Sequence, residues 1–117
     1  MKQRAFMELK FDVRDNICIL SLIGRFTTGS DSEYRLAWEE LRKRGVRNTI
    51  VNCAELPYID STGLSFMVGL HKKLKDDGGR FVLTLVNPRV RSLLELTRLH
   101  ELIPVFDDLD AALKAIN

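Results

Sequence analysis

The sequence predicts an α/β domain with a mixed, mostly parallel sheet, an antiparallel N-terminal edge strand and about four helices. Short apolar runs alternate with amphipathic segments of helical period along almost the whole chain. This alternation is typical of strands joined by right-handed crossover helices, which makes the strands parallel. The first two strands are separated only by Asp15-Asn16, a turn that suits an antiparallel hairpin and is too short for a crossover.

The predicted strands differ in how many of their faces are apolar. In residues 7–13 apolar and charged side chains alternate, so one face should lie on the core and the other in water. Residues 17–23 are apolar at every position except Ser21. Residues 49–54 and 80–86 are also largely apolar, which favours central parallel strands that are buried on both faces.

Capping residues mark four helices, which begin after Ser30, after Asp60, after Asn87, and after Asp107 or Asp108. Ser30 and Glu33 have the spacing of a capping box, and Gly45 is placed to end the first helix. Pro88 suits the first position of the third helix, which follows the strand at 80–86. The side chains expected to face the core are Leu64, Met67, Leu70 and Leu74 on the second helix, Val90, Leu93, Leu94 and Thr97 on the third, and Leu109, Ala112, Leu113 and Ile116 on the fourth.

Length and composition restrict the class of protein. The 117 residues are 45% hydrophobic and 29% charged, which suits a single domain over residues 1–117. A net charge of +2 gives little attraction for nucleic acid or anionic lipid, so neither is expected as a direct partner. No apolar run approaches the ~20 residues of a membrane span, and residues 1–4 do not lead into a signal-peptide core. We expect a cytoplasmic protein in which Cys18 and Cys53, each inside an apolar run, are buried and reduced.

The chain lacks the motifs of several catalytic classes. The phosphate-binding glycine loop, the nucleophile elbow and the zinc-binding helix of metalloproteases are all absent from the sequence. His71 and His100 are the two histidines, and neither has a nucleophile or an acid spaced to serve it. His71 is expected at the edge of the core, and His100 at a helix C-terminus, where a cation is favourable. We therefore expect no enzyme activity, no catalytic residue, no metal and no cofactor.

The most informative segment is Asp60-Ser61-Thr62-Gly63, which lies at the carboxyl edge of the predicted sheet, where open α/β proteins place their sites. Two interpretations are open. In the first, Asp60 caps the helix and the next three residues form its first turn. In the second, Ser61 is phosphorylated, because a phosphate there would meet free backbone amides and the positive end of the helix. Thr62 is the second choice as phosphate acceptor, since it offers the same hydroxyl one residue later.

These residues make the chain similar to STAS domains of the bacterial anti-sigma factor antagonist type. Asp60-Ser61-Thr62-Gly63-Leu64 resembles the family's phosphorylation motif, which has aspartate, serine, serine or threonine, glycine and leucine in this order. Further similarity lies in residues 52–59, in residues 86–90, which open the third helix, and in residues 102–106 followed by residues 111–113. The resemblance extends over nearly the whole chain and implies a STAS-type fold.

The resemblance also implies a regulatory role. An unmodified antagonist binds an ATP-dependent serine kinase that is itself an anti-sigma factor, and a sigma factor is thereby released. Phosphorylation at the position matching Ser61 breaks this contact, a metal-dependent serine phosphatase restores it, and Asp60 and Gly63 support the switch. The alternative is a constitutive STAS scaffold subunit of a lipid-transport ABC system or of a stressosome-like complex, although a permanent subunit has no need of a phosphorylatable serine.

One segment departs from the family pattern. Relatives carry acids in the segment that ends the second strand, where this chain has Gly24-Arg25-Phe26-Thr27. The loops that leave parallel strands meet at one edge of a sheet, so Arg25, Thr27 and Thr28 are expected beside Asp60 and Ser61. Arg25 is then a candidate phosphate contact, because its guanidinium suits paired recognition of phosphate oxygens. The alternative is that Arg25 extends into solvent and pairs with nothing.

The expected partner surface surrounds the same segment. Thr27 and Thr28 belong to it through their place beside Ser61. Phe66 and Val68 flank the inner stripe of the second helix, so one of them is expected to remain partly exposed for the partner. The alternative is that neighbouring helices bury both.

Overall fold

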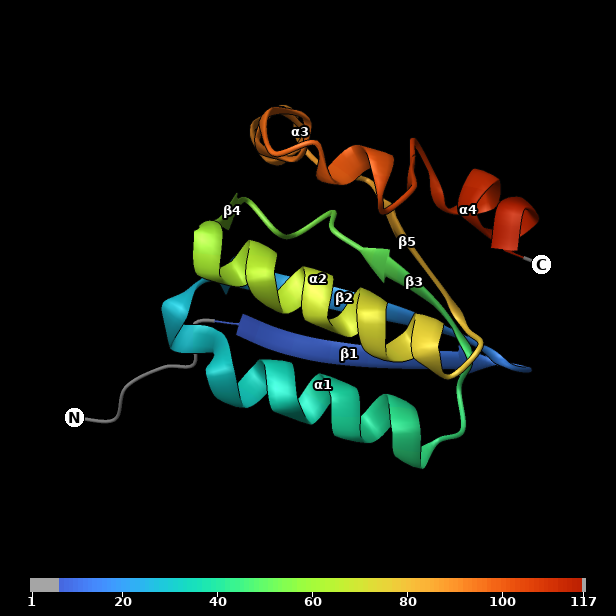
Figure 1. The fold of residues 1–117 in the computed structure, drawn as a ribbon. Coiled ribbons are helices and arrows are strands. Elements are labelled where there is room, and N and C mark those ends of the chain that lie inside the picture. The colour runs from blue at the N-terminus through green and yellow to red at the C-terminus, as the bar shows by residue number, and fades with distance from the viewer. Residues whose placement is uncertain (1–6, 117) are drawn as a thin grey trace.

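The structure, a computed structural model, describes residues 7–116 (Figure 1). Both ends of the predicted domain, residues 1–6 and 117, lie outside the described residues. The strands are β1 (Met7–Arg14), β2 (Ile17–Phe26), β3 (Asn48–Asn52), β4 (Tyr58–Ile59), β5 (Arg80–Thr84) and β6 (Val105–Phe106). The helices are α1 (Asp31–Lys43), α2 (Ser61–Asp76), α3 (Pro88–Leu96) and α4 (Leu109–Ile116), with 3-10 turns at Thr28–Ser30 and Leu99–Glu101.

The sheet has the predicted topology. Its strand order is β1-β2-β3-β5-β6, with β1 antiparallel to β2 and each of the following pairs parallel. The short strand β4 pairs in parallel with the end of β2. The prediction of a mostly parallel sheet with an antiparallel N-terminal edge strand and four helices is therefore confirmed.

Alternate residues of the central strands face two different cores. Ile17 and Ile19 of β2 pack with Ala112 and Ile116 of α4 on one face of the sheet. Cys18, Leu20 and Leu22 face the other core, which is covered mainly by α1 and α2 (Figure 1). Because both faces are covered, the apolar runs in β2, β3 and β5 lack the period of two that β1 shows.

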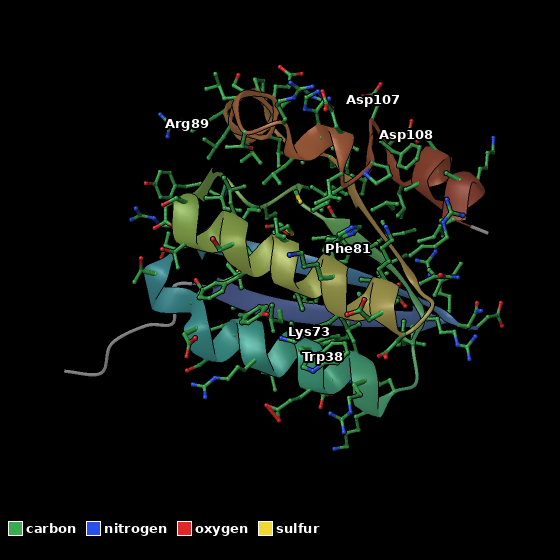
Figure 2. The ribbon with its side chains drawn as sticks, in the orientation of Figure 1. Trp38, Lys73, Phe81, Arg89, Asp107 and Asp108 are labelled. Carbon is green, nitrogen blue, oxygen red and sulfur yellow. The ribbon has the colours of Figure 1, made fainter. Side chains whose placement is uncertain are left out.

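Contacts of a half-buried lysine join the two helices on one face. Lys73 points from α2 toward Trp38 of α1 (Figure 2), and its Nζ lies 5.8 Å from the centre of the Trp38 ring. The same ammonium group donates a hydrogen bond of 2.9 Å to the hydroxyl oxygen of Tyr34. These contacts fix α2, whose first residue is Ser61, against α1.

Several local predictions need correction. The first helix is not capped through a Ser30–Glu33 capping box, because the Ser30 side chain forms no cap bond. Ser30 is fully buried, and its hydroxyl donates to the Arg25 carbonyl oxygen and accepts from the Thr27 amide, both at 3.0 Å. Thr97 does not face the core either. It is exposed at the end of α3, where its hydroxyl donates to carbonyl oxygens of the last turn.

Other local predictions are confirmed. Gly45 follows α1 with φ of +66°, a conformation that favours glycine. Asn87 caps α3 by accepting from the Val90 amide at 2.8 Å. Cys18 and Cys53 are buried free thiols. Within residues 7–116, no helix has both the length and the apolar character needed to span a membrane.

Candidate functional site

The segment Asp60–Gly63 connects β4 to α2 beside the end of β2. Arg25 pairs with Tyr58 and Phe26 with Ile59, so β4 runs along the last residues of β2. The Asp60 amide extends this pairing by donating to the Phe26 carbonyl oxygen at 3.2 Å. The turn after β2 and the start of α2 therefore lie side by side, as the parallel topology predicts.

The Asp60 carboxylate joins these two segments. Its Oδ1 accepts from the Gly63 amide at 2.8 Å, which is the N-cap bond of α2. Its Oδ2 accepts from the Thr28 amide at 3.4 Å. The predicted cap is confirmed, and both carboxylate oxygens are occupied by backbone amides.

The two hydroxyls of the segment differ in exposure and in bonding. Ser61 is exposed as the first residue of α2, and its hydroxyl forms no hydrogen bond with the residues that the structure describes. Thr62 is half-buried, and its Oγ1 accepts from the Thr28 hydroxyl at 3.2 Å. A group transferred to Thr62 would break this bond, whereas the Ser61 hydroxyl can receive a group without losing a protein contact.

Gly63 allows α2 to approach the end of β2. A Cβ at this position would lie 2.0 Å from the Phe26 carbonyl oxygen and 2.8 Å from Cγ1 of Ile59. No side chain fits there without displacing backbone. The sequence indicates only a helical residue after the cap, because the contact comes from a strand far earlier in the chain.

Arg25 lies at the end of β2 with its side chain exposed. Its guanidinium carbon is 4.8 Å from the centre of the Tyr58 ring, a cation–π contact. The alternative prediction is therefore confirmed in that the Arg25 side chain is exposed, and wrong in that it has a contact, with the Tyr58 ring. The role of Arg25 as a phosphate contact stays a prediction. Tyr58 in turn lines a groove that also contains Ser61, so the Arg25 guanidinium lies beside the wall of that groove.

Two grooves open beside Ser61, and this residue lines both. The first has a volume of about 460 Å³ and lies between β4 and α3. Its lining includes Tyr58, Ser61, Arg89, Leu93 and Leu96. The second, of about 380 Å³, lies between α2 and the end of α3, and its lining includes Ser61, Leu64, Val68, Thr97 and Leu99. A partner that fills either groove will touch Ser61.

Phe66 and Val68 are both half-buried, but their surroundings differ. The Phe66 ring stacks on Tyr34 with centroids 4.6 Å apart and lies 5.7 Å from the Phe26 ring. Val68 lines the second groove. The structure thus encloses neither side chain fully, and places only Val68 in a groove with Ser61.

Sequence reasoning did not single out Arg89 or Leu96. Arg89 projects from the start of α3 on the side of the molecule that carries β4 (Figure 2), and it lines the first groove. Leu96 lines the same groove and is 81% exposed. The available signal was that Leu96 is apolar but lies outside the stripe expected to face the core.

Neither histidine lies in these grooves. His71 is 8% exposed, its ring centre is 6.0 Å from that of Phe81, and neither ring nitrogen has a hydrogen-bond partner. Burial, and to a lesser extent Lys75 and Lys72, lower the pKa of His71. His100 is exposed. Among residues 7–116, no group of three or more histidine, cysteine or acidic side chains is arranged to hold a metal ion.

Comparison with known sequences finds a matching domain family and relatives that share one kind of name. The family model of the STAS domain matches residues 8–112. An anti-sigma F factor antagonist of Paenibacillus polymyxa is 23% identical over 103 residues, which are 87% of this chain and 88% of the relative. An anti-sigma-B factor antagonist of Staphylococcus aureus is 35% identical over 65 residues, which are 56% of this chain and 60% of the relative.

Comparison with solved structures confirms the predicted fold. An anti-sigma factor antagonist from Mycobacterium paratuberculosis has a TM-score of 0.84 at 19% identity, covering 99% of this chain and 98% of that one. The Bacillus cell fate determinant SpoIIAA in its phosphorylated form has a TM-score of 0.68 at 19% identity, covering 95% and 99%. A sulfate transporter family protein from Wolinella succinogenes has a TM-score of 0.77 at 21% identity, covering 90% and 88%. At these identities the likeness concerns the fold alone.

Proposed function

Because the chain belongs to the STAS domain family, we propose that it is a phosphorylation-controlled antagonist of an anti-sigma factor. In the unmodified form it binds, in the cytoplasm, an ATP-dependent serine kinase that is the anti-sigma factor, and a sigma factor is released. Phosphate on Ser61 breaks this contact, and a metal-dependent serine phosphatase removes the phosphate. Relatives that are anti-sigma factor antagonists support the general role.

One observation carries the proposal: the exposed Ser61 hydroxyl stands at the junction of two grooves and forms no hydrogen bond with described residues. A phosphate on Ser61 would place a charge close to −2 at this junction. A partner seated in the grooves would have to bury that charge, which is costly without a matching cation. The same surface can therefore bind a partner when unmodified and repel it when phosphorylated.

The chemistry requires a separate kinase. The Ser61 oxygen forms a bond to the γ-phosphorus of ATP, the bond to the β-phosphate oxygen breaks, ADP leaves, and the hydroxyl proton goes to a base. The Asp60 carboxylate belongs to the residue before Ser61, and both of its oxygens accept backbone hydrogen bonds. We infer that the base belongs to the kinase. Dephosphorylation reverses the modification when water attacks the phosphorus and Ser61 regains its proton.

The test is phosphate mapping of the protein isolated from its native cells, combined with phosphorylation of the purified chain by the kinase that it captures there. Ser61→Ala should abolish incorporation of phosphate from ATP, whereas Thr62→Ala should retain it. Phosphate found only on Thr62 would overturn the assignment of Ser61. A stable, stoichiometric complex with no phosphate on either residue would instead favour the constitutive scaffold.

A further inference from the structure

The strand β1 forms an edge of the sheet, and its outer side is open in the described part of the chain. It pairs with β2 over eight residues, Met7–Arg14, on its inner side. No described residue forms a backbone hydrogen bond with its outer side. An edge strand of this length presents a row of amides and carbonyls that can pair with a strand of another chain.

The side chains of β1 separate into a charged face and an apolar face. Glu8, Lys10, Asp12 and Arg14 are all exposed and alternate in sign along one face. On the other face, Leu9 and Phe11 are half-buried against the core, and Val13 is 39% exposed. Lysine or other charges of one sign on an edge strand resist pairing between identical chains. Charges of alternating sign do not resist such pairing, because an antiparallel second copy presents the same charges in reverse order, which places opposite signs across from each other.

We propose that β1 pairs antiparallel with β1 of a second copy of this chain, with the two Phe11 residues opposite each other at the two-fold axis. In this register Glu8 of each copy faces Arg14 of the other, and Lys10 faces Asp12. On the apolar face Leu9 faces Val13. Every charged pair across the interface is then of opposite sign, and every pair on the other face is apolar, which is favourable for cross-strand neighbours.

The neighbouring registers are unfavourable. Backbone groups of a strand point alternately inward and outward, so two copies of one edge can shift relative to each other only in steps of two residues. Centred on Lys10, the pairing places Lys10 opposite Lys10 and Glu8 opposite Asp12. Centred on Asp12, it places Asp12 opposite Asp12 and Lys10 opposite Arg14. Of these three registers, the charges therefore favour the one centred on Phe11.

The dimer leaves the proposed regulatory site uncovered. Antiparallel pairing of the two β1 strands makes one continuous sheet in which the strands of the two copies run in opposite senses. The carboxyl ends of β2, which lie beside Ser61, then point toward opposite ends of the assembly. Pairing through β1 therefore goes beyond the proposed function and does not depend on phosphorylation of Ser61.

Sedimentation equilibrium of the full chain tests the proposal. The wild-type protein should show a mass near twice 13.4 kDa as its concentration rises toward about 1 mM. Lys10→Asp or Asp12→Lys alone should raise the dissociation constant of the dimer about tenfold or more, because each places like charges opposite each other twice. The double variant, Lys10→Asp with Asp12→Lys, should restore dimerisation, since it only exchanges the two charges.

Controls separate pairing from folding and net charge. Lys114→Asp makes the same change of charge on the exposed side of α4 and should leave the mass unchanged. Phe11→Cys should form a disulfide between copies under mild oxidation, because residues directly opposite in antiparallel strands are about 4.5–5.5 Å apart at Cα, within disulfide range. A wild-type protein that stays monomeric up to about 1 mM overturns the proposal. So does a dimer that both single charge reversals leave intact.

Discussion

Replacing Gly63 by alanine tests whether the close approach of α2 to β2 fixes the position of Ser61. The added Cβ would lie 2.0 Å from the Phe26 carbonyl oxygen and 2.7 Å from the carbonyl carbon. Phe26 is fully buried, and its carbonyl accepts the Asp60 amide, so this backbone cannot retreat without losing that bond. Gly69→Ala is the matched control on the same helix, because its Cβ would meet the terminal hydroxyl of Tyr34 instead of backbone.

The expected magnitudes follow from these contacts. Overpacking costs about 1–3 kcal/mol, and loss of the Asp60–Phe26 hydrogen bond costs about 1 kcal/mol. Alanine offsets up to about 1 kcal/mol, because it is a better helix former than glycine. Gly63→Ala should therefore lower the free energy of unfolding by about 2 kcal/mol. Gly69→Ala should change it by less than about 1 kcal/mol, because a half-buried tyrosine can shift and the gain in helix propensity compensates.

Urea unfolding measures both free energies, and thermal melts should show a decrease of about 8 °C for Gly63→Ala. In addition, Gly63→Ala should alter the amide chemical shifts of Thr28 and Ser61, because the turn after β2 has to move. Equal stability of the two variants would refute the reasoning, since the Cβ of Gly63→Ala meets backbone and that of Gly69→Ala meets the end of a side chain.

Three further predictions concern the cap, a buried histidine and the thiols. Asp60→Ala should lower the free energy of unfolding in urea by about 1 kcal/mol, whereas Asp60→Asn should retain most of the cap, and equal losses would contradict the capping role. The fold lowers the pKa of His71 from its ordinary value of 6.5, so the unfolded chain binds a proton at His71 more readily than the folded chain does. The free energy of unfolding should therefore fall as the pH drops from 6.5 toward the pKa of His71 in the folded state. Thermal melts across this range should show the fall in wild type but not in His71→Leu. Burial raises the pKa of Cys18 to about 11 and of Cys53 to about 12, so a thiol reagent at neutral pH should modify them only after denaturant is added, and rapid modification of the folded protein would contradict their burial.

The fold could be predicted from sequence because the apolar patterns record which faces are covered. β1 alternates because one of its faces is exposed, whereas β2 does not, since Ile19 contacts α4 and Leu20 belongs to the opposite core. Local signals also placed the caps at Asp60 and Asn87 correctly. In both cases the capping side chain and the amide that it accepts from are only three residues apart.

Contacts between distant segments were less predictable. Ser30 has capping-box spacing, but the turn after β2 directs its hydroxyl to the backbone of Arg25 and Thr27, which satisfies it locally. The hydrogen bond of Thr62 to Thr28, which distinguishes Thr62 from Ser61, exists only because β4 pairs with the end of β2. The grooves beside Ser61 depend in the same way on the positions of α2 and α3, which residue spacing does not determine.

The most direct test of the proposed switch is a titration of the two forms of the protein against the serine kinase that the unmodified chain captures from its native cells. Calorimetry should show that the chain phosphorylated on Ser61 binds at least about a hundredfold more weakly than the unmodified chain, because the partner would have to bury the phosphate. The Ser61→Ala variant should bind as the unmodified chain does. Equal affinity of the phosphorylated and unmodified chains would contradict the switch.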